Sequence, residues 1–500
     1  MADASLKYLT ARTIKWNAID KLSSQVLYGV TGIILANLLS DEDFGLVGAV
    51  TIFQAFAALF VDSGFSFALI QRKSPTQADY SSVFWFNMGM STVMYIILFA
   101  CAKLIALCFD GDMRLVPLSR VMFLNLIINA LSIVQINILT KKMDVRMVAI
   151  SNTVGMVAGA VVGIWLAFAG YGAWAVVWQT LTLGSVKAAM LWVTGHWCPM
   201  AVCSWRILKS YFSVGFGVMG SAWLNTLFQN INGIVIGNRN GMASLGYYTQ
   251  ADKWSKMGVA SLSQILNTSF LPALSQYQDS PKDFAALTAK MNRLTAYLAL
   301  PACIFLAVLA TPIFHVLFGD KWDASILLFQ LLLVRGIFVI FAAGYNNYLI
   351  ALGKAKLMIV AETVRDVLTL LAIIVTVPYI ALASPGNLML GVQIFVAGQV
   401  AAAFIAWGWM LFMVARVSYS TPWRFILDML PYAVESVVIA MCASVMSRFI
   451  DNAWILLAAQ GSVLAAAYIG INGILKSKIQ KDVFDYVRKK KAKKQADSTN

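Results

Sequence analysis

The sequence predicts an all-helical integral membrane protein with about fourteen transmembrane helices. Hydrophobic residues make up 60% of the 500 residues, charged residues only 12%, and the mean hydropathy is +0.74. A water-soluble domain could not solvate such a surface, so lipid must be the main solvent. The apolar runs are also continuous, whereas the strands of a membrane β-barrel would alternate apolar and polar residues. Helices are therefore the expected spanning elements.

Fourteen apolar segments follow from dividing the chain at charged residues and at Gly, Pro and Asn. They lie near residues 13–39, 44–70, 80–109, 114–140, 147–169, 172–194, 207–237, 242–275, 284–317, 324–352, 355–382, 387–415, 425–449 and 452–474. Each reaches the roughly 20 residues that a helix needs to cross a 30 Å hydrocarbon core. Several are longer, which predicts tilted helices or ends that extend into water.

The first two segments are repeated about two hundred residues later. Gly32, Asn37 and Gly45 recur as Gly233, Asn238 and Gly246, at a constant offset of 201. The repeat places the seventh span on the first, and six spans is an even number, so both halves cross the membrane in the same sense. We therefore expect two six-helix bundles related by a pseudo-two-fold axis along the membrane normal, plus two C-terminal helices.

This architecture divides the chain into four parts. Residues 1–200 would form the N-terminal six-helix lobe and residues 201–415 the C-terminal six-helix lobe. Residues 416–475 would supply the two additional transmembrane helices. Residues 476–500 would form a basic cytoplasmic tail that lies on anionic headgroups.

Lys and Arg are concentrated in alternate loops. With the N-terminus counted as cytoplasmic, the inner segments and the tail hold 26 basic residues and the outer loops hold four, Arg114, Arg239, Lys321 and Arg448. The positive-inside rule then places both termini in the cytoplasm. Orientation and the tail account for most of the +15 net charge, so no nucleic-acid partner is expected.

The loops leave no room for a soluble active site, because connections such as 40–43, 170–172 and 238–241 are very short. The six cysteines are scattered, and Cys198 and Cys203 lack the histidine pair of a common zinc site. We therefore expect no catalytic residues, no metal and no resident cofactor. A coupling ion, H⁺ or Na⁺, remains open.

Eight of the 38 basic residues lie inside predicted spans. A charge at the bilayer centre costs about 2.5–3.5 kcal/mol even on insertion scales, so each needs a partner, an interface or water. Lys103, Arg120 and Lys187 lie near span ends and can extend to the headgroups.

Four other cations lie near mid-depth, namely Lys21, Lys253, Lys256 and Arg335. A water-filled cavity is the economical explanation for them, and we take them as candidate substrate-binding residues. Ion pairs with Asp20, Asp62 or Asp252 are the alternative.

Acidic residues within the spans are candidates for ion coupling. Glu362, Arg365 and Asp366 are spaced at i, i+3 and i+4, which predicts a self-neutralising cluster on one helix face. An ion-coupling site that uses Glu362 and Asp366 is the alternative reading. Asp20 and Asp62, with Glu435, are the other candidates for coupling to protons or sodium.

A cavity with excess positive charge suits an amphiphilic anion, such as a phosphate head on a lipid tail. Lysine side chains act as flexible point charges for phosphate. Polar side chains on the first and seventh spans could hydrogen-bond sugars; they are Gln25, Asn225, Gln229, Asn230 and Asn232. Packing between helices is an equally good explanation for these amides.

An ordered set of short motifs runs through the eighth and ninth spans. It comprises Leu245-Gly246-Tyr247-Tyr248, Gln250-Ala251-Asp252-Lys253, Phe270-Leu271-Pro272-Ala273-Leu274-Ser275, Arg293, Leu300-Pro301, Leu317-Phe318-Gly319 and Trp322. Phe44-Gly45 and Gln71-Arg72 precede it. The set resembles the polysaccharide transporter branch of the MOP exporter superfamily, the Wzx-like lipopolysaccharide and exopolysaccharide flippases, close to colanic-acid-type exporters.

This resemblance implies a bacterial inner-membrane protein with two lobes around a central cavity. Such proteins flip undecaprenyl-pyrophosphate-linked sugar repeat units from the cytoplasmic to the periplasmic leaflet by alternating access, for lipopolysaccharide, exopolysaccharide or capsule synthesis. Membrane lipids and polysaccharide-assembly proteins would be its partners. The family's cationic cavities support Lys21, Lys253 and Lys256 as candidates.

Three other functions remain as alternatives. A multidrug exporter of the same superfamily would handle organic cations, which an acidic cavity favours. A membrane-embedded polysaccharide polymerase or ligase would need a positioned acid, base or nucleophile. A scaffold for other membrane enzymes would need no deep charges.

The charge bias generates a topological prediction. A reporter that is active only in the periplasm should be active when fused after residue 170 and inactive when fused at the C-terminus, because loops rich in Lys and Arg stay inside. A cytoplasmic reporter should give the reverse pattern. An external C-terminus would contradict both the fourteen-span count and the six-span repeat.

Overall fold

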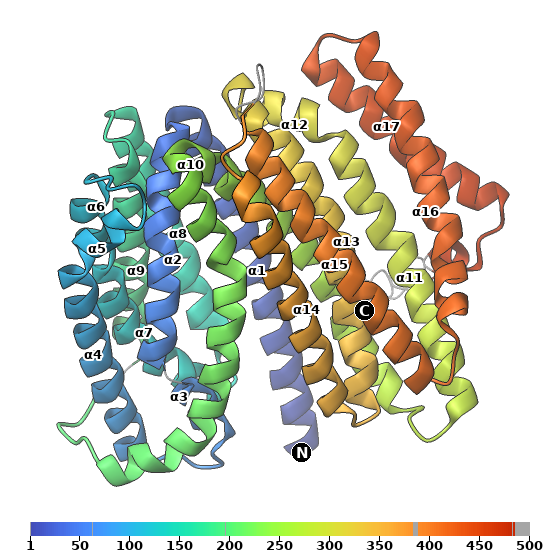
Figure 1. The fold of residues 1–500 in the computed structure, drawn as a ribbon. Helices are drawn as coiled ribbons and strands as arrows, with labels where there is room; N and C mark the ends of the chain where they lie inside the picture. Colours follow the sequence, from blue (N-terminus) through green and yellow to red (C-terminus); the bar gives the residue numbers. More distant parts are fainter. Residues whose placement is uncertain (1, 63, 196, 384–388, 483, 486–500) are drawn as a thin grey trace, which may run out of the picture. The chain divides into compact units, whose positions relative to one another are not determined.

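The computed structural model describes residues 2–62, 64–195, 197–383, 389–482 and 484–485. Throughout these ranges the regular structure is helical, with seventeen α-helices, three short 3₁₀ helices and no strand (Figure 1). The prediction of an all-helical fold is confirmed. Contacts divide the chain into two compact units, Met1–Thr249 and Gln250–Asn500, which are described separately.

The first unit contains nine helices and the greater part of a tenth. They are α1 (Ala2–Leu38), α2 (Asp41–Asp62), α3 (Phe65–Gln71), α4 (Gln77–Ala100), α5 (Ala102–Leu107), α6 (Leu115–Met122), α7 (Leu124–Lys141), α8 (Val145–Phe168), α9 (Ala173–Gly195) and α10 (Trp205–Ser275). Within this unit α8 packs between α1 and α9, and α7 packs between α4 and α9.

The second unit begins within α10 and continues with seven helices. They are α11 (Pro281–Val308), α12 (Ala310–Leu317), α13 (Asp323–Ala351), α14 (Ala355–Thr376), α15 (Leu390–Val417), α16 (Pro422–Ser444) and α17 (Ala453–Ile474). The 3₁₀ helices are η1 (Asp320–Trp322), η2 (Val377–Tyr379) and η3 (Val445–Arg448). Here α11 packs on α16 and α13, and α15 packs on α13 and α14.

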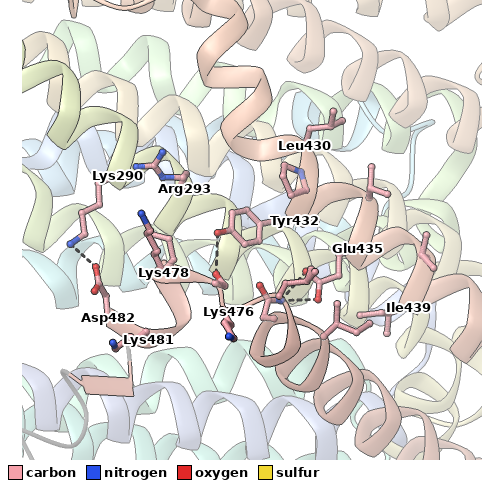
Figure 2. Close-up of a pocket in the computed structure, with 18 residues that line it drawn as sticks. Lys290, Arg293, Leu430, Tyr432, Glu435, Ile439, Lys476, Lys478, Lys481 and Asp482 are labelled. Atoms are coloured by element: carbon pink, nitrogen blue, oxygen red, sulfur yellow. Dashed lines mark hydrogen bonds and ion pairs between the residues drawn. The ribbon is translucent and has the colours of Figure 1, made fainter.

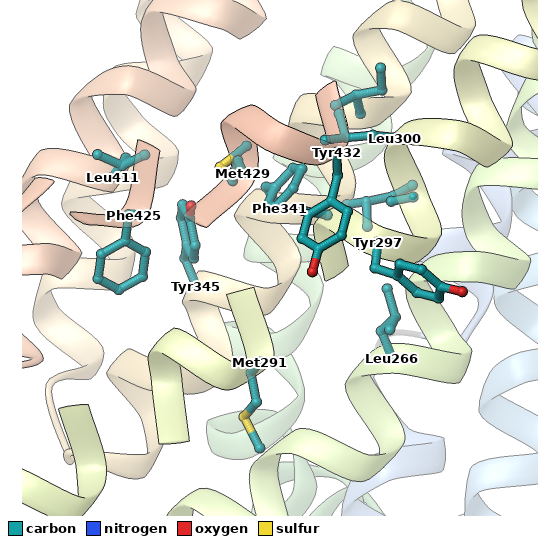
Figure 3. Close-up of a cluster of buried hydrophobic side chains, with 14 of the residues drawn as sticks. Leu266, Met291, Tyr297, Leu300, Phe341, Tyr345, Leu411, Phe425, Met429 and Tyr432 are labelled. Carbon is teal, nitrogen blue, oxygen red and sulfur yellow. The ribbon is translucent and has the colours of Figure 1, made fainter. Parts of the chain in front are cut away.

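A buried aromatic cluster holds the second unit together (Figure 3). Phe341, Tyr345 and Phe425 are each 1% exposed, so α13 and α16 share one core. Buried Asn292 of α11 joins the same core, because its amide donates to the carbonyl oxygen of Phe425 at 3.0 Å and accepts from the Tyr345 hydroxyl at 3.2 Å. The polar atoms are thus paired inside an apolar cluster, as burial requires.

Ten helical segments among the described residues are long and apolar enough to cross a membrane. The other four predicted spans, 13–39, 207–237, 242–275 and 355–382, are also helical and lie in α1, α10 and α14. They carry more charged and amide side chains, including Lys21, Lys253, Lys256 and Glu362. Most candidate residues therefore lie on the four most polar spans.

The internal repeat is visible as the same helix–turn–helix in both halves. Helix α10 is interrupted at Gly241, where φ is 80° and ψ is 176°. A side chain would be strained in this backbone conformation. The residue 201 positions earlier is Ser40, in the turn between α1 and α2. Residues 205–240 of α10 thus correspond to α1, and residues 242–275 correspond to α2.

Two equivalent glycines of the repeat touch each other's helices. A Cβ atom on Gly45 would lie 1.9 Å from the carbonyl oxygen of Met242, and one on Gly246 would lie 1.9 Å from the carbonyl oxygen of Asp41. Asp41 and Met242 are also 201 residues apart. The contact is therefore symmetric, because each helix offers the same backbone surface to the other.

The order of the contacts along the two helices gives the direction of the local two-fold axis. Gly48 lies one turn beyond Gly45, and a Cβ on it would lie 2.8 Å from the hydroxyl oxygen of Thr249, its own repeat equivalent. The matched pairs advance in the same direction along both helices, so the helices run parallel here. The local two-fold axis that exchanges these two segments therefore runs parallel to both of them.

The unit boundary lies at residue 249, whereas the predicted lobes meet at residue 200. The reason is that residues 205–240 of α10 pack on the first unit. Asn238 donates to the carbonyl oxygen of Cys108 at 2.7 Å, and Arg72 donates to the Tyr211 hydroxyl at 3.1 Å. The four-part division stays a prediction, and its last fifteen residues, 486–500, lie outside the described ranges.

The short turns near the start of α2 are joined by ion pairs and hydrogen bonds. Arg114 lies 2.7 Å from Glu42 and 2.7 Å from Asp112. The hydrogen bond from Arg114 holds the pKa of the Asp112 carboxyl below its ordinary value. Asp43 accepts from the backbone of Ala173 at 2.8 Å. These contacts tie the start of α2 to two neighbouring turns.

The glycine contact generates a stability prediction. Gly45→Leu and Gly246→Leu should each lower the thermal unfolding midpoint of the protein in detergent, because overpacking a close contact costs about 1–3 kcal/mol. Gly89→Leu is the matched control, since a Cβ on Gly89 would meet no atom within 4 Å. Equal midpoints for all three variants would show that the helices do not approach as described.

Candidate functional site

Asp20 lies on the face of α1 that packs against α8. Asn152 donates to the Asp20 carboxylate and to the Ser24 hydroxyl, both at 3.0 Å. The Ser23 hydroxyl lies 3.3 Å from that of Thr153. Because Asp20, Ser23 and Ser24 are spaced at i, i+3 and i+4, they form one polar stripe along the helix. The stripe gives the half-buried carboxylate hydrogen-bond partners within the span.

Lys21 follows Asp20 in the chain but lies on a different face of α1. Its side chain is exposed, and it forms no ion pair with any described residue. Lys187 of α9, in contrast, lies within electrostatic reach of Asp20. Asp20 is therefore hydrogen-bonded from α8 and lies in the field of a cation on α9, and the charge of Lys21 is left to water or a ligand.

Asp62 has a local structural role at the end of α2. Its carboxylate accepts from the backbone N–H of Ser66 at 3.3 Å and from the Ser66 hydroxyl. Asn137 of α7 donates to the same hydroxyl at 2.8 Å. Asp62 thus satisfies a free N–H group in the first turn of α3, as a capping side chain does.

Residues 250–256 of α10 hold the densest group of candidates. The Lys256 ammonium lies 2.6 Å from the Asp252 carboxylate. The Lys253 ammonium lies 5.2 Å from the ring centroid of Trp254, within cation–π range. The Trp254 indole donates to Gln250 at 3.1 Å, and a buried amide nitrogen of Gln250 has no partner among the described residues.

Arg335 of α13 lies near this group. It precedes Gly336, at which an added Cβ would lie 2.3 Å from the Val259 side chain of α10. Val259 is one turn beyond Lys256, so the two helices bring their cations to the same part of the second unit. Arg335 is half-buried and forms no ion pair with any residue that the structure describes.

The charged cluster of α14 is held by one short pair. Arg365 donates to Asp366 at 2.9 and 3.0 Å, which leaves Glu362 half-buried on the same helix. The roles of Asp20, Asp62, Glu362 and Asp366 in ion coupling all stay predictions.

An open cleft that sequence reasoning missed lies in the second unit (Figure 2). It has a volume of about 1220 Å³ and is lined by α11, α16, the end of α17 and residues 476–482. Its one visible signal in the sequence is the spacing of Lys476, Lys478 and Lys481 directly after an apolar span.

A further polar group lies at the C-terminal end of α12 and in the residues that follow it. Ligand atoms of His315, Asp320 and Asp323 lie within 4.8 Å of one another. The imidazole is already paired with Asp323 at 2.8 Å, and both carboxylates are exposed. Nothing in this group indicates a bound metal.

Solved structures show the fold of this chain. Lipid II flippase MurJ in an inward closed conformation aligns with a TM-score of 0.69 over 94% of this chain and 100% of that chain, at 16% identity. An inward-facing multidrug resistance MATE family transporter of the MOP superfamily aligns with a TM-score of 0.61 over 81% of this chain and 99% of that chain, at 18% identity. These likenesses show that the chain has the fold of these multi-pass membrane proteins.

The chain belongs to the polysaccharide biosynthesis protein family, whose profile matches residues 34–327. It is 27% identical over 312 residues to the succinoglycan biosynthesis transport protein ExoT of Rhizobium meliloti, which covers 62% of this chain and 63% of that protein. It is 22% identical over 335 residues to the lipopolysaccharide biosynthesis protein WzxC of Escherichia coli, 67% and 68% of the two chains. The match therefore spans less than two thirds of the rhizobial relative. The resemblance inferred from the motifs is confirmed.

The Asp252–Lys256 pair generates a testable prediction. Asp252→Asn and Lys256→Gln should each lower the unfolding midpoint, because each leaves one charge without its partner. The double variant should lose less unfolding free energy than the two single variants lose together. The difference, the coupling free energy, should be about 0.5–3 kcal/mol. Strict additivity in detergent melting experiments would show that the two charges do not interact.

Proposed function

We propose that this protein is a flippase that moves undecaprenyl-pyrophosphate-linked oligosaccharide repeat units from the cytoplasmic to the periplasmic leaflet by alternating access. Family membership and the transport and biosynthesis roles named for its relatives support the proposal. The likeness to a lipid II flippase supports a lipid-linked substrate at the level of the fold.

The observation that carries the proposal is the excess positive charge where α10 meets α13. On these stretches of the two helices, Lys253, Lys256 and Arg335 stand against one acid, Asp252. A pyrophosphate needs positive charge in a partly dehydrated site, and lysine supplies it as a flexible point charge. Lys256 is paired with Asp252, whereas Arg335 forms no ion pair with any described residue, so Arg335 is the better candidate for the headgroup. Lys253 and, separately, Lys21 of α1 stay candidates.

The repeat in the sequence supports alternating access as the mechanism. Two similar halves related by an axis along the membrane normal can rock against each other and expose a site to either side in turn. Both termini would lie in the cytoplasm and the protein in the bacterial inner membrane. Polysaccharide-assembly proteins would supply and receive the substrate.

The driving force would be a coupling ion, H⁺ or Na⁺. Among the acids proposed for coupling, Asp20 has the better geometry. Its carboxylate is half-buried inside a span, on a helix that also carries Lys21, and it accepts a hydrogen bond from Asn152. The Asp62 carboxylate, in contrast, already accepts a hydrogen bond from the backbone of Ser66 at the start of α3.

The main alternative is a multidrug exporter, since a MATE family transporter shares the fold. Organic cations favour acidic sites, and the charge excess of the α10–α13 group is positive. A polymerase or ligase would need a positioned acid–base pair or nucleophile, which this group does not provide. The anionic substrate is therefore the better fit.

The substrate proposal predicts the effect of single substitutions. Lys253→Gln should lower export of the lipid-linked oligosaccharide by roughly 10- to 150-fold, because a charge-assisted contact contributes about 1.5–3 kcal/mol. Lys253→Arg should retain more activity, since the charge is kept. The measurement is the appearance of the oligosaccharide at the periplasmic face of spheroplasts, at matched protein levels.

Lys103→Gln is the control, because Lys103 is an exposed lysine on α5 far along the chain from this group. It should export normally. Normal export by Lys253→Gln and Arg335→Gln together would refute the headgroup role. Resistance to organic cations that survives loss of these charges would favour the multidrug alternative.

A further inference from the structure

The cleft between α11, α16 and α17 lies at one level of the membrane. The uncharged runs 294–314, from α11 into α12, and 453–475, which is α17 with one further residue, are 21 and 23 residues long. At the helical rise they would span roughly 32 and 34 Å, close to the thickness of the hydrocarbon core. The first run begins directly after Arg293, and the second run ends directly before Lys476. Arg293 is paired with Asp428 of α16 at 3.0 Å, which places the third helix at the same level. The cleft is therefore at the boundary between headgroups and acyl chains.

The distribution of Lys and Arg predicts that this boundary is on the cytoplasmic side of the membrane. Helix α11 begins just before Lys282, and α16 begins just before Arg424, both in predicted inner segments. Lys476 ends the apolar run of α17 on the same side. It has a positive φ of 50°, and this turn directs residues 477–482 back toward α11.

The residues after α17 are fixed by contacts to two helices. Asp482 accepts from Lys290 of α11 at 2.6 Å, and the Ser477 hydroxyl lies 3.4 Å from that of Tyr432 on α16 (Figure 2). The backbone N–H of Ser477 also donates to the carbonyl oxygen of Asn472 at 3.0 Å. Residues 477–482 thus form one wall of the cleft and are held in place by these contacts.

The lining of the cleft is strongly basic. Five cations and two acids line it, and both acids are already engaged. Glu435 accepts two hydrogen bonds from Asn472, at 2.7 and 2.8 Å, and Asp482 is paired with Lys290. Lys476, Lys478 and Lys481 form no ion pair with any residue in the described ranges. Three lysines therefore share the cleft with one carboxylate, Glu435, that is not held in an ion pair, which leaves an excess of positive charge.

The opposite side of the cleft is apolar and uncovered. Leu430, Val434 and Val438 of α16 are 48%, 53% and 47% exposed, and Leu475 at the end of α17 is 69% exposed. The spacing of Leu430, Val434 and Val438 at i, i+4 and i+8 makes them one stripe along α16. An apolar stripe beside three cations matches the two chemistries of an anionic lipid, one for the acyl chain and one for the phosphate.

We propose that this cleft binds a single anionic glycerophospholipid of the cytoplasmic leaflet. Its phosphate is neutralised by Lys476, Lys478 and Lys481, and one acyl chain lies along the stripe of Leu430, Val434 and Val438. The lipid closes the gap between α16 and α17 and holds the two additional helices against α11. The inference rests on the geometry of the second unit and is independent of the transported substrate.

Lipid binding to the purified full-length protein tests this site. Native mass spectrometry would measure the affinity for dioleoyl phosphatidylglycerol, with dioleoyl phosphatidylcholine as the zwitterionic comparison. K476Q/K478Q/K481Q should weaken phosphatidylglycerol binding at least about tenfold, and Lys478→Gln alone about fivefold, since each basic residue near a headgroup contributes to the attraction. Phosphatidylcholine should bind weakly to every variant.

The matched control is K489Q/K490Q/K491Q, which removes the same three charges from residues outside the described ranges. It should bind phosphatidylglycerol within about twofold of the unaltered protein. Equal losses in both triple variants would mean diffuse attraction by the tail and would overturn the proposal. If the first triple variant does not elute as a single species, the Lys478→Gln comparison decides alone.

Two further outcomes separate the lipid from other anions. Inorganic pyrophosphate at millimolar concentration should not displace phosphatidylglycerol, because it cannot use the apolar stripe. Displacement would mean a site for a soluble anion. Val434→Asn should weaken lipid binding while leaving the weak binding of pyrophosphate unchanged. An unchanged lipid affinity in this variant would show that no acyl chain lies on α16.

Discussion

The structure depends on one constraint, which is that hydrocarbon does not solvate charge. A charged or strongly polar side chain persists inside a span only where another group, water or a headgroup meets it. Asp20 accepts a hydrogen bond from Asn152. Lys256 and Arg293 form ion pairs with Asp252 and Asp428, respectively. The same constraint requires a helix wherever the chain crosses the membrane, because every backbone N–H and carbonyl must be satisfied internally. The helical fold and the pairing of charged side chains therefore both follow from the inability of hydrocarbon to solvate polar groups.

This constraint explains why the fold could be predicted. Among the described residues, each predicted span is built of helix, including the polar ones on α1 and α14, because the backbone has no alternative in lipid. The repeat could be read from a few residues, since Gly45 and Gly246 are required where two backbones touch. The unit boundary could not be read, because it depends on which neighbours residues 205–240 of α10 contact.

The site was only partly predictable, because side-chain partners depend on how helices are rotated and which ones pack together. The spacing of Asp252 and Lys256 places them on one face, so their pairing was an open alternative from the start. The capping role of Asp62 requires the helix break that follows it, which the sequence pattern does not indicate. The cleft near Lys476 depends on a turn that brings residues 477–482 back across two helices.

The symmetric contact between α2 and α10 also bears on how such a chain could have originated. Because Gly45 faces Met242 while Gly246 faces Asp41, the interface is isologous, the kind that two identical subunits form with each other. A half-length ancestor that carried this segment once would dimerise through the same surface, in parallel orientation, without any new complementarity. Gene duplication and fusion would then join the two copies covalently, and the residues nearest the axis, such as Gly48 and Thr249, would be the first that were free to diverge.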